Sequence, residues 1–558
     1  MSIERAFRNQ RLNQMVALAA ILVLAAVLRF DSLSQRGLIY WDEAKFALEG
    51  VRLHAYMVSI FGGHVSLLAG KTIGTAKPMH AFLIAIAYLI FGVHTYTPLF
   101  MDAFCSVVEV GVLFLLGRRL FGPWVGLIAA LFLAVSEYDV IYARSALSES
   151  DADLMFLACV VLWAFDWERI SIAPKLKGRP TRMLLFAALL AGASFTANYR
   201  LVIYILVLMA FDLIWAVKEY GRRSILPRIG LWVGGLVAMP LLWQIVDILF
   251  RVAGHPLFRS EVNILVKSGH SVLFKNVTQN GIEFYLIQAL FQLHGSGQSN
   301  FHFGPIIYLK WFVLREGWLI VAFLIVGLFF AIRTRQFPRL ILASLVVFPY
   351  LVYMVAPYVV PRNLDAALPF ALLLAAAALV SLAERIPTDV ARRAVMIGTA
   401  CVVAAYGAWL SWPLTGERSG FASIAAYVQA HGGSALASND VMVWYVPGSQ
   451  SSTVCKTPGM ASNKNQLAAD IAAGYRYAEI ETIDNSPLDK FIVANARRVA
   501  HYPTYGAISI GENPVKSENG DPPNPKPLEY VSLYDLSTLK LPSPVGAKVS
   551  GCNRDVPI

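Results

Sequence analysis

Long apolar stretches recur along most of this 558-residue chain, and they constrain its fold more than any other feature. A helix needs about 20 mostly apolar residues to cross the hydrocarbon core of a bilayer, so we expect about eleven spans, a few of them short. They lie near residues 12–29, 98–117, 123–141, 153–167, 183–197, 201–217, 229–250, 317–332, 340–356, 366–382 and 394–411. The sequence therefore predicts an α-helical polytopic membrane protein that contacts membrane lipids.

The charge of the chain fits this class better than it fits a nucleic-acid-binding protein. Only 15% of the residues are charged and 57% are hydrophobic, whereas about a quarter of a soluble domain is charged. The formal net charge is +11, but many of the basic residues lie in short clusters between apolar stretches, as the positive-inside rule predicts. We therefore expect no nucleic-acid partner.

The positive-inside rule also gives a topology. Arg5, Arg8 and Arg11 precede the first apolar stretch, which lacks a small-residue cleavage site at its end, so we expect a retained span with a cytoplasmic N-terminus. The stretch 80–94 is short for a span, and we interpret it as a juxtamembrane or partly inserted helix. With that choice every basic connection shares the side of the N-terminus. These connections are Arg118-Arg119, 169–182, 218–228, 333–339 and 385–393.

The same parity predicts which segments lie outside the cytoplasm of what we take to be a bacterial inner membrane. They are 30–97, 142–152, 198–200, 251–316, 357–365 and 412–558. Charged residues at membrane boundaries are costly to hold and are functional by default. Several lie on this outer face, namely Asp42, Glu43, Lys77, Arg144, Glu149, Asp151, Asp153, Arg200, Arg259 and Arg362.

The tail differs in kind from the rest of the chain. From residue 412 onward it carries Gly, Pro and Asn clusters and short alternating runs such as 441–446, which predict a small extracytoplasmic α/β domain after a membrane domain of residues 1–411. A disulfide between Cys455 and Cys552 is compatible with an oxidising compartment, although spacing does not show its geometry. No CxxC or HExxH pattern is present, so we expect no dedicated structural zinc site.

Several motifs, in their order and spacing, resemble those of the GT-C glycosyltransferases, in the superfamily of the protein O-mannosyltransferases and the lipid A aminoarabinose transferases. The resemblance covers residues 1 to about 410 and fades in the tail. The motifs are Trp41-Asp42-Glu43-Ala44-Lys45-Phe46-Ala47, Lys77-Pro78, Gly117-Arg118-Arg119-Leu120-Phe121-Gly122, Tyr142-Ala143-Arg144-Ser145-Ala146-Leu147-Ser148-Glu149, and Arg362 with Leu368-Pro369.

The chain also departs from the family pattern. Lys77-Pro78 is followed by Met79-His80 where the family commonly has a second proline and an aromatic residue. Glu149, with Asp151 close behind, stands where many members have Asp.

The resemblance implies transfer of a sugar from a polyprenyl-phosphate donor to an extracytoplasmic acceptor, with inversion at the anomeric carbon. The acceptor could be a lipid, a glycan or a protein. Asp42 is the candidate base, and Glu43 is expected to raise the pKa of Asp42 or to orient the acceptor. Cations should stabilise the departing phosphate, and Arg suits bidentate contacts with it.

The remaining roles complete the predicted site. Glu149 is a second candidate catalytic carboxylate, and a divalent cation between Asp42 and Glu149 is compatible with the resemblance but not required. The candidate phosphate-binding residues are Lys77, Arg144, Arg200 and Arg362. His80 and Asp151 are candidate substrate contacts.

Structural interpretations compete with each role. The acidic pair could cap a juxtamembrane helix, Lys77 could be an interfacial residue, and the arginines could mark the ends of spans. A transporter or flippase of lipid-linked sugars is the alternative function. It would need polar or broken helices near the midplane and often internal repeats, whereas here the charges gather on one face and no repeat is evident.

Overall fold

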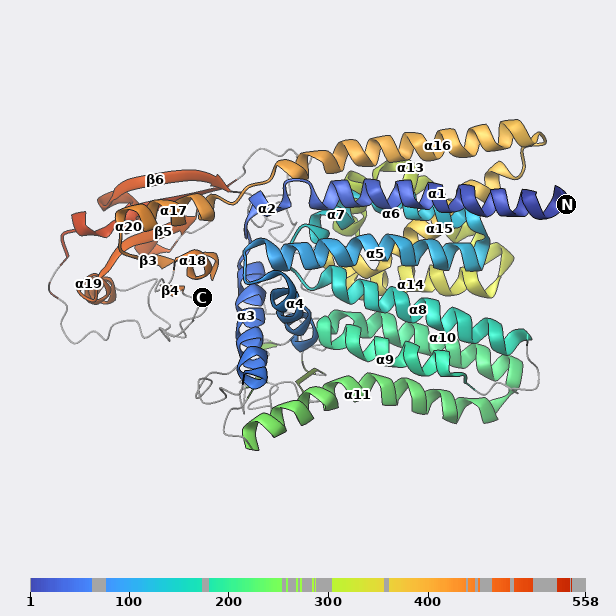
Figure 1. Cartoon of the computed structure of the whole chain (residues 1–558), viewed down its shortest axis with the longest axis horizontal. Helices are drawn as coiled ribbons and strands as arrows, with labels where there is room; N and C mark the ends of the chain where they lie inside the picture. Colours follow the sequence, from blue (N-terminus) through green and yellow to red (C-terminus); the bar gives the residue numbers. More distant parts are fainter. Residues whose placement is uncertain are drawn as a thin grey trace.

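A bundle of long helices forms most of the molecule in this computed structural model. The structure describes residues 2–62, 77–172, 180–252, 257–258, 267–268, 271–272, 284–285, 287, 304–355, 361–437, 440–446, 450–451, 464–481, 486–504, 529–541 and 543. The bundle helices are α1 (Ser2–Phe30), α5 (Tyr96–Phe121), α6 (Pro123–Val135), α7 (Glu137–Ala143), α8 (Glu149–Ile172), α9 (Arg182–Ala197), α10 (Val202–Tyr220), α11 (Ile225–Val252), α13 (Gly304–Thr334), α14 (Phe337–Val355), α15 (Leu368–Ala383) and α16 (Asp389–Ser411). Figure 1 shows them running along one direction.

The lengths and compositions of these helices confirm a multi-pass membrane protein. Among the described residues, eight helical stretches are long and apolar enough to cross a bilayer. Helices α6 and α7, which meet at an angle of 60°, would make a ninth if they form one bent span. Helix α9 has only 16 residues, and α8 carries acidic residues in its first turn. The expected total of eleven spans therefore stays a prediction.

Two helices lie across one end of the bundle. Helix α3 (Trp41–Phe61) runs nearly perpendicular to the spans, and α4 (Pro78–Phe91) lies beside it (Figure 1). They pack closely because Gly50 of α3 has no side chain, and a Cβ there would come within 2.3 Å of Ile84 of α4. The stretch interpreted as a juxtamembrane helix thus lies at the end of the bundle.

The other end of the bundle carries the N-terminus and the turn between α15 and α16 (Figure 1). The N-terminus and the basic connection between α15 and α16 therefore lie at the same end of the bundle, as the alternation of the basic connections predicts. Which end faces the cytoplasm is a separate matter and stays a prediction.

The C-terminal part contains a mixed five-stranded sheet in the order β4-β3-β5-β7-β6. Strand β3 pairs in parallel with β4 and β5, whereas β7 is antiparallel to β5 and β6. The strands are β3 (Ser434–Ala437), β4 (Gln450–Ser451), β5 (Tyr475–Glu481), β6 (Arg497–Thr504) and β7 (Glu529–Asp535). The helices are α17 (Gly420–His431), α18 (Asp440–Tyr445), α19 (Lys464–Ala472) and α20 (Pro487–Asn495), and a separate pair, β1 (Lys267–Ser268) and β2 (Ser271–Val272), precedes α13.

This C-terminal part packs on the end of the bundle that carries α3 and α4. Ser419 donates its hydroxyl to the carbonyl of Leu38 at 2.6 Å, and the hydroxyl of Tyr445 accepts from the amide of Leu38 at 2.9 Å. The ring of Trp444 stacks on Tyr88 of α4, with 6.5 Å between ring centroids. The sheet agrees with the expected α/β character of the tail. The domain division at residue 412 stays a prediction, and Cys455 and Cys552 lie outside the described residues.

Candidate active site

Five buried charged side chains come together at the end of the bundle beneath α3 and α4. Each is supplied by a helix start or by a short 3-10 turn, where the chain changes direction. All five are at most 6% exposed. They are Asp42 in the first turn of α3, Lys77 immediately before α4, Glu149 at the start of α8, Arg200 in the turn Tyr199–Leu201 and Arg362 in the turn Pro361–Ala367.

Two ion pairs organise this group. Arg362 Nη1 donates to Asp42 Oδ2 at 3.2 Å, and Arg200 Nη1 donates to Glu149 Oε1 at 3.2 Å. Lys77 donates to the hydroxyl of Ser148, the residue before Glu149. The sequence separations of 320 and 51 residues across the two ion pairs mean that the tertiary fold creates the group. We call these five residues the charged cluster.

The cluster carries more positive than negative charge, with three cations against two carboxylates. Burial alone would raise the pKa of Asp42, but the positive charges of Arg362, Lys45 and Lys77 outweigh burial and hold that pKa below its usual value. Burial lowers the pKa of Lys77 to about 8, with Arg200 and Arg362 adding to the shift and the two carboxylates opposing it. At neutral pH Asp42 is therefore ionised and Lys77 is mostly cationic.

Glu43 points away from the charged cluster. Its carboxylate pairs with Arg36 at 2.9 Å and accepts the backbone N–H groups of Ile39 and Tyr40 at 2.7 and 3.1 Å, as the N3 residue of a capping box on α3. The expectation that Glu43 raises the pKa of Asp42 is wrong, because that pKa is lowered and Arg362 is its main charge partner.

Arg144 also lies apart from the charged cluster. Its Nη1 donates to the carbonyl oxygens of Leu28, Arg29 and Asp31 at 3.2, 3.1 and 3.0 Å, at the end of α1. Leu28 and Arg29 belong to the last turn of α1, where carbonyls lack partners within the helix, and Asp31 follows that turn, so Arg144 caps α1. Burial lowers the pKa of Arg144 to about 10. The structure thus brings together three of the four predicted phosphate-binding cations.

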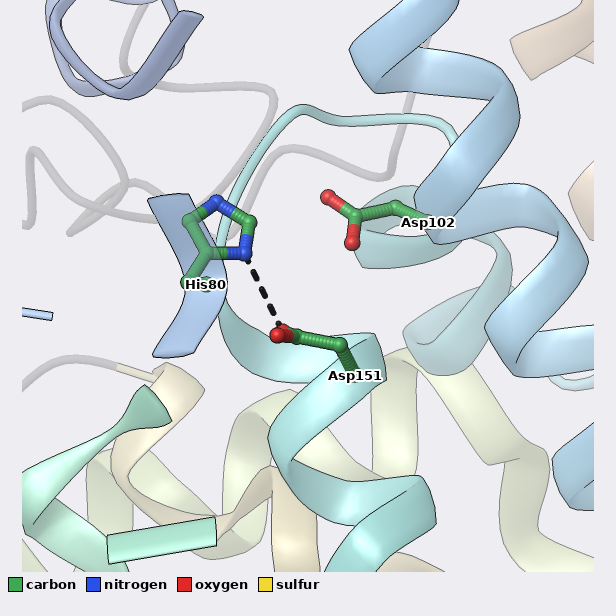
Figure 2. Close-up of side chains that lie close together, drawn as sticks. All are labelled: His80, Asp102 and Asp151. Atoms are coloured by element: carbon green, nitrogen blue, oxygen red, sulfur yellow. Dashed lines mark ion pairs between the residues drawn. The ribbon is translucent and has the colours of Figure 1, made fainter. Parts of the chain in front are cut away.

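His80 and Asp151 meet, but in a second group rather than in the charged cluster. Nδ1 of His80 lies 3.2 Å from Oδ1 of Asp151, and Asp102 of α5 is the third member (Figure 2). One candidate ligand atom from each of the three lies within 4.8 Å of the others. This is the one such group of possible metal ligands in the described part of the chain. From the sequence, Asp102 could be recognised only as a polar residue in a span that faces the bundle interior.

An apolar cavity of about 320 Å³ opens between α3, α4 and α11. Leu53 and Tyr56 of α3, Met79 and Phe82 of α4, and Trp243 of α11 line part of it. Met79 lies two residues after Lys77, so α4, which Lys77 directly precedes, supplies part of the cavity wall.

Comparison with known proteins gives the class. Residues 75–246 match the sequence model of the family described as dolichyl-phosphate-mannose-protein mannosyltransferase. This region includes Lys77, Glu149 and Arg200 of the charged cluster. No curated protein sequence matches the chain.

Two solved structures share the fold. ArnT from Cupriavidus metallidurans bound to undecaprenyl phosphate is 13% identical, with a TM-score of 0.59, and the alignment covers 94% of this chain and 99% of that one. The apo oligosaccharyltransferase of Archaeoglobus fulgidus is 11% identical, with a TM-score of 0.52, and the alignment covers 84% of this chain and 69% of that one.

The structure therefore defines a multi-pass membrane protein with the fold of ArnT and of the archaeal oligosaccharyltransferase. The chain is similar in sequence to the protein mannosyltransferases over residues 75–246 and in fold to ArnT over nearly its whole length, which confirms the resemblance seen in its motifs.

Proposed function

We propose that this chain transfers a sugar from a polyprenyl-phosphate donor to an acceptor hydroxyl or amine at the extracytoplasmic face of a bacterial inner membrane. The observation that carries the proposal is the charged cluster, in which an ionised carboxylate and three cations are buried together at the end of the bundle. Two structures of the same fold support the donor class, since the ArnT structure holds undecaprenyl phosphate and the AglB structure from Archaeoglobus fulgidus holds a dolichol-phosphate with an inhibitory peptide.

Asp42 acts as the general base in this proposal. As the acceptor oxygen or nitrogen attacks the anomeric carbon, its proton passes to the Asp42 carboxylate, and the bond from that carbon to the phosphate oxygen breaks on the opposite face. The product sugar therefore has inverted configuration. The ion pair with Arg362 at 3.2 Å keeps Asp42 deprotonated before the acceptor binds and orients its free oxygen.

The cations of the cluster receive the leaving group. The electron pair of the broken bond stays on the polyprenyl phosphate, and fixed positive charges in a water-poor site stabilise it more than they would in water. Lys77 and Arg200 lie with Glu149, and Arg362 lies with Asp42, so phosphate binding would draw on cations from both pairs. Glu43 holds the start of α3, and with it Asp42, through Arg36; Arg144 holds the end of α1.

The apolar cavity supports binding of a lipid chain beside the phosphate. Met79 and Phe82 line it within two turns of Lys77, so a headgroup at Lys77 and an apolar chain in the cavity could be bound at once. A divalent cation between Asp42 and Glu149 is not required, because each of these carboxylates already has an arginine partner.

The test compares cells that lack the active gene with the same cells carrying wild-type protein, Asp42→Asn or Asp31→Asn. Asp31 is an exposed carboxylate at the same end of the bundle and serves as the matched control. Mass spectrometry of envelope glycolipids and glycoproteins should reveal one sugar addition that requires the gene. Wild type and Asp31→Asn should restore it, whereas Asp42→Asn should reduce the transfer rate by about 100-fold or more.

A binding measurement separates loss of chemistry from loss of fold. Purified Asp42→Asn protein should still bind undecaprenyl phosphate, whereas Arg362→Ala should bind it more weakly. Full transfer by Asp42→Asn would disprove the assignment of the base. If the purified protein moved a lipid-linked sugar across the membrane of vesicles but transferred no sugar to an acceptor, the transporter would be favoured instead.

A further inference from the structure

The group formed by His80, Asp102 and Asp151 has no role in the proposed chemistry. The three residues come from α4, α5 and α8, and all three are 0% exposed. Figure 2 shows the imidazole of His80 and the two carboxylates turned toward a common space between the helices. Three helices thus direct their polar side chains to one buried point.

These polar atoms are poorly satisfied within the protein. Among the described residues, neither ring nitrogen of His80 and no carboxylate oxygen of Asp102 or Asp151 has a partner in good hydrogen-bond geometry. The 3.2 Å approach of His80 to Asp151 is close but lacks that geometry. The backbone N–H of Leu147 approaches Asp102 as a hydrogen-bond donor, but its geometry is poor. Buried carboxylates without full compensation cost several kcal/mol each, so this arrangement calls for a further partner.

The surrounding charge favours a cation as that partner. Asp151, Glu149 and Glu43 all exert negative charge on Asp102. The nearby arginines are engaged elsewhere, since Arg200 pairs with Glu149 and Arg362 pairs with Asp42. In the forms that bind a metal, one imidazole and two carboxylates together carry a charge of −2, which one divalent cation balances.

We propose that His80, Asp102 and Asp151 bind a divalent metal ion of the zinc class through one ring nitrogen and one oxygen from each carboxylate. Zinc takes nitrogen and carboxylate oxygen ligands at about 2.0 to 2.2 Å, which puts tetrahedral ligands about 3.4 Å apart. His80 and Asp151 are already 3.2 Å apart. The ligand atoms lie within 4.8 Å of one another, so a shift of the Asp102 carboxylate by up to about 1.4 Å toward the other two ligands would complete the site.

Such an ion would position the charged cluster. His80 lies one turn after Lys77 on α4, and Asp151 lies two residues after Glu149 on α8. The metal would therefore tie together the first turns of the two helices that present Lys77 and Glu149. Its effect on transfer rests on the proposed function, but metal binding itself does not, so the two can fail separately.

The test measures the metal content of full-length, tag-free protein purified in detergent, supplied with zinc and then dialysed. Elemental analysis should find about one equivalent per chain, and His80→Ala and Asp102→Asn should each lower it at least fivefold. Glu109→Gln changes another buried carboxylate of α5 and should retain the metal. Asp42→Asn should also retain it, which separates this site from a metal bridging Asp42 and Glu149.

X-ray absorption on the wild-type protein keeps the proposal testable if the variants misfold. We expect a first shell of nitrogen and oxygen with the signature of one imidazole, and a lower unfolding temperature after chelation. Metal below about 0.2 equivalents in wild type, or metal unchanged by both ligand substitutions, would overturn the site. The group would then be a metal-free contact between His80 and Asp151 beside Asp102.

Discussion

Lys77 is a buried cation whose pKa is lowered by burial, and it makes the proposed site sensitive to pH. Its pKa of about 8 means that it is cationic below pH 8 and loses its charge above it. The pKa of Asp42 is lowered, so Asp42 stays ionised throughout this range. We therefore expect kcat/KM, which reports on the free enzyme, to be flat near neutrality and to fall about tenfold per unit well above pH 8. Lys77→Arg should remove this alkaline limb, and an unchanged limb in that variant would assign it to another group.

Asp42 and Glu43 are neighbours in the sequence, but their substitutions should affect different properties. Substitution of Asp42 should slow transfer, whereas substitution of Glu43 should lower the stability of the protein. Glu43 is 0% exposed and its partner Arg36 is 2% exposed. Glu43→Gln therefore leaves a buried guanidinium whose remaining carboxylate contact is Glu417 at 3.5 Å, beside its hydrogen bond to the carbonyl of Gly37 at 3.1 Å. Breaking one side of a buried ion pair costs about 3 kcal/mol, which should appear as a clear drop in unfolding temperature in detergent. Glu384→Gln, at an exposed position, should leave that temperature unchanged. Equal stability of the two variants would show that Glu43 is not needed to hold α3.

The sequence indicated which charged residues share an end of the bundle, but it could not assign their partners. Alternation of the spans placed Asp42, Lys77, Glu149, Arg200 and Arg362 together. Whether a side chain faces the cluster depends on helix rotation and on the termini packed beside it. Arg144 donates to carbonyl oxygens at the end of α1, and Glu43 forms an ion pair with Arg36. The metal ligands contributed by α4, α5 and α8 form no local motif, so a search for zinc spacings could not find them.

At the scale of helices and strands, apolar length predicted where helices lie but not how each one is interrupted. The span expected from residue 317 begins at a break inside α13, where Gly317 has a φ of +81°. A Cβ there would lie 2.6 Å from the ring of Tyr406, so both conformation and close packing require glycine. The helical segment 304–316 before this break was not predicted, since its apolar residues gave no separate span signal.

Close packing of α9 against α11 gives a prediction at the same scale. Backbones approach closely at Gly192 and Gly235, because a Cβ on Gly235 would lie 2.4 Å from the backbone of Ala188. Small residues allow such contacts between helices in membranes. Gly235→Val should separate the two helices and lower the unfolding temperature, whereas Gly234→Val, with open space around it, should not. Similar unfolding temperatures for the two valine variants would contradict this packing.

For the whole molecule, the distribution of charge along the chain predicts the topology, and the last prediction concerns the orientation of the bundle in the membrane. Asp31 and Asp389 are both exposed. Asp31 directly follows the end of α1 and Asp389 begins α16, and these two helix ends lie at opposite ends of the bundle (Figure 1). The positive-inside rule puts the Asp389 end, with Arg385, Arg392 and Arg393, in the cytoplasm. In a background with the native cysteines replaced by serine, a cysteine at position 31 should react with a membrane-impermeant maleimide in intact cells. A cysteine at position 389 should react only after the inner membrane is permeabilised. The reverse pattern would put Asp42 and the charged cluster on the cytoplasmic side and would rule out an extracytoplasmic acceptor, because the cluster lies at the same end of the bundle as Asp31.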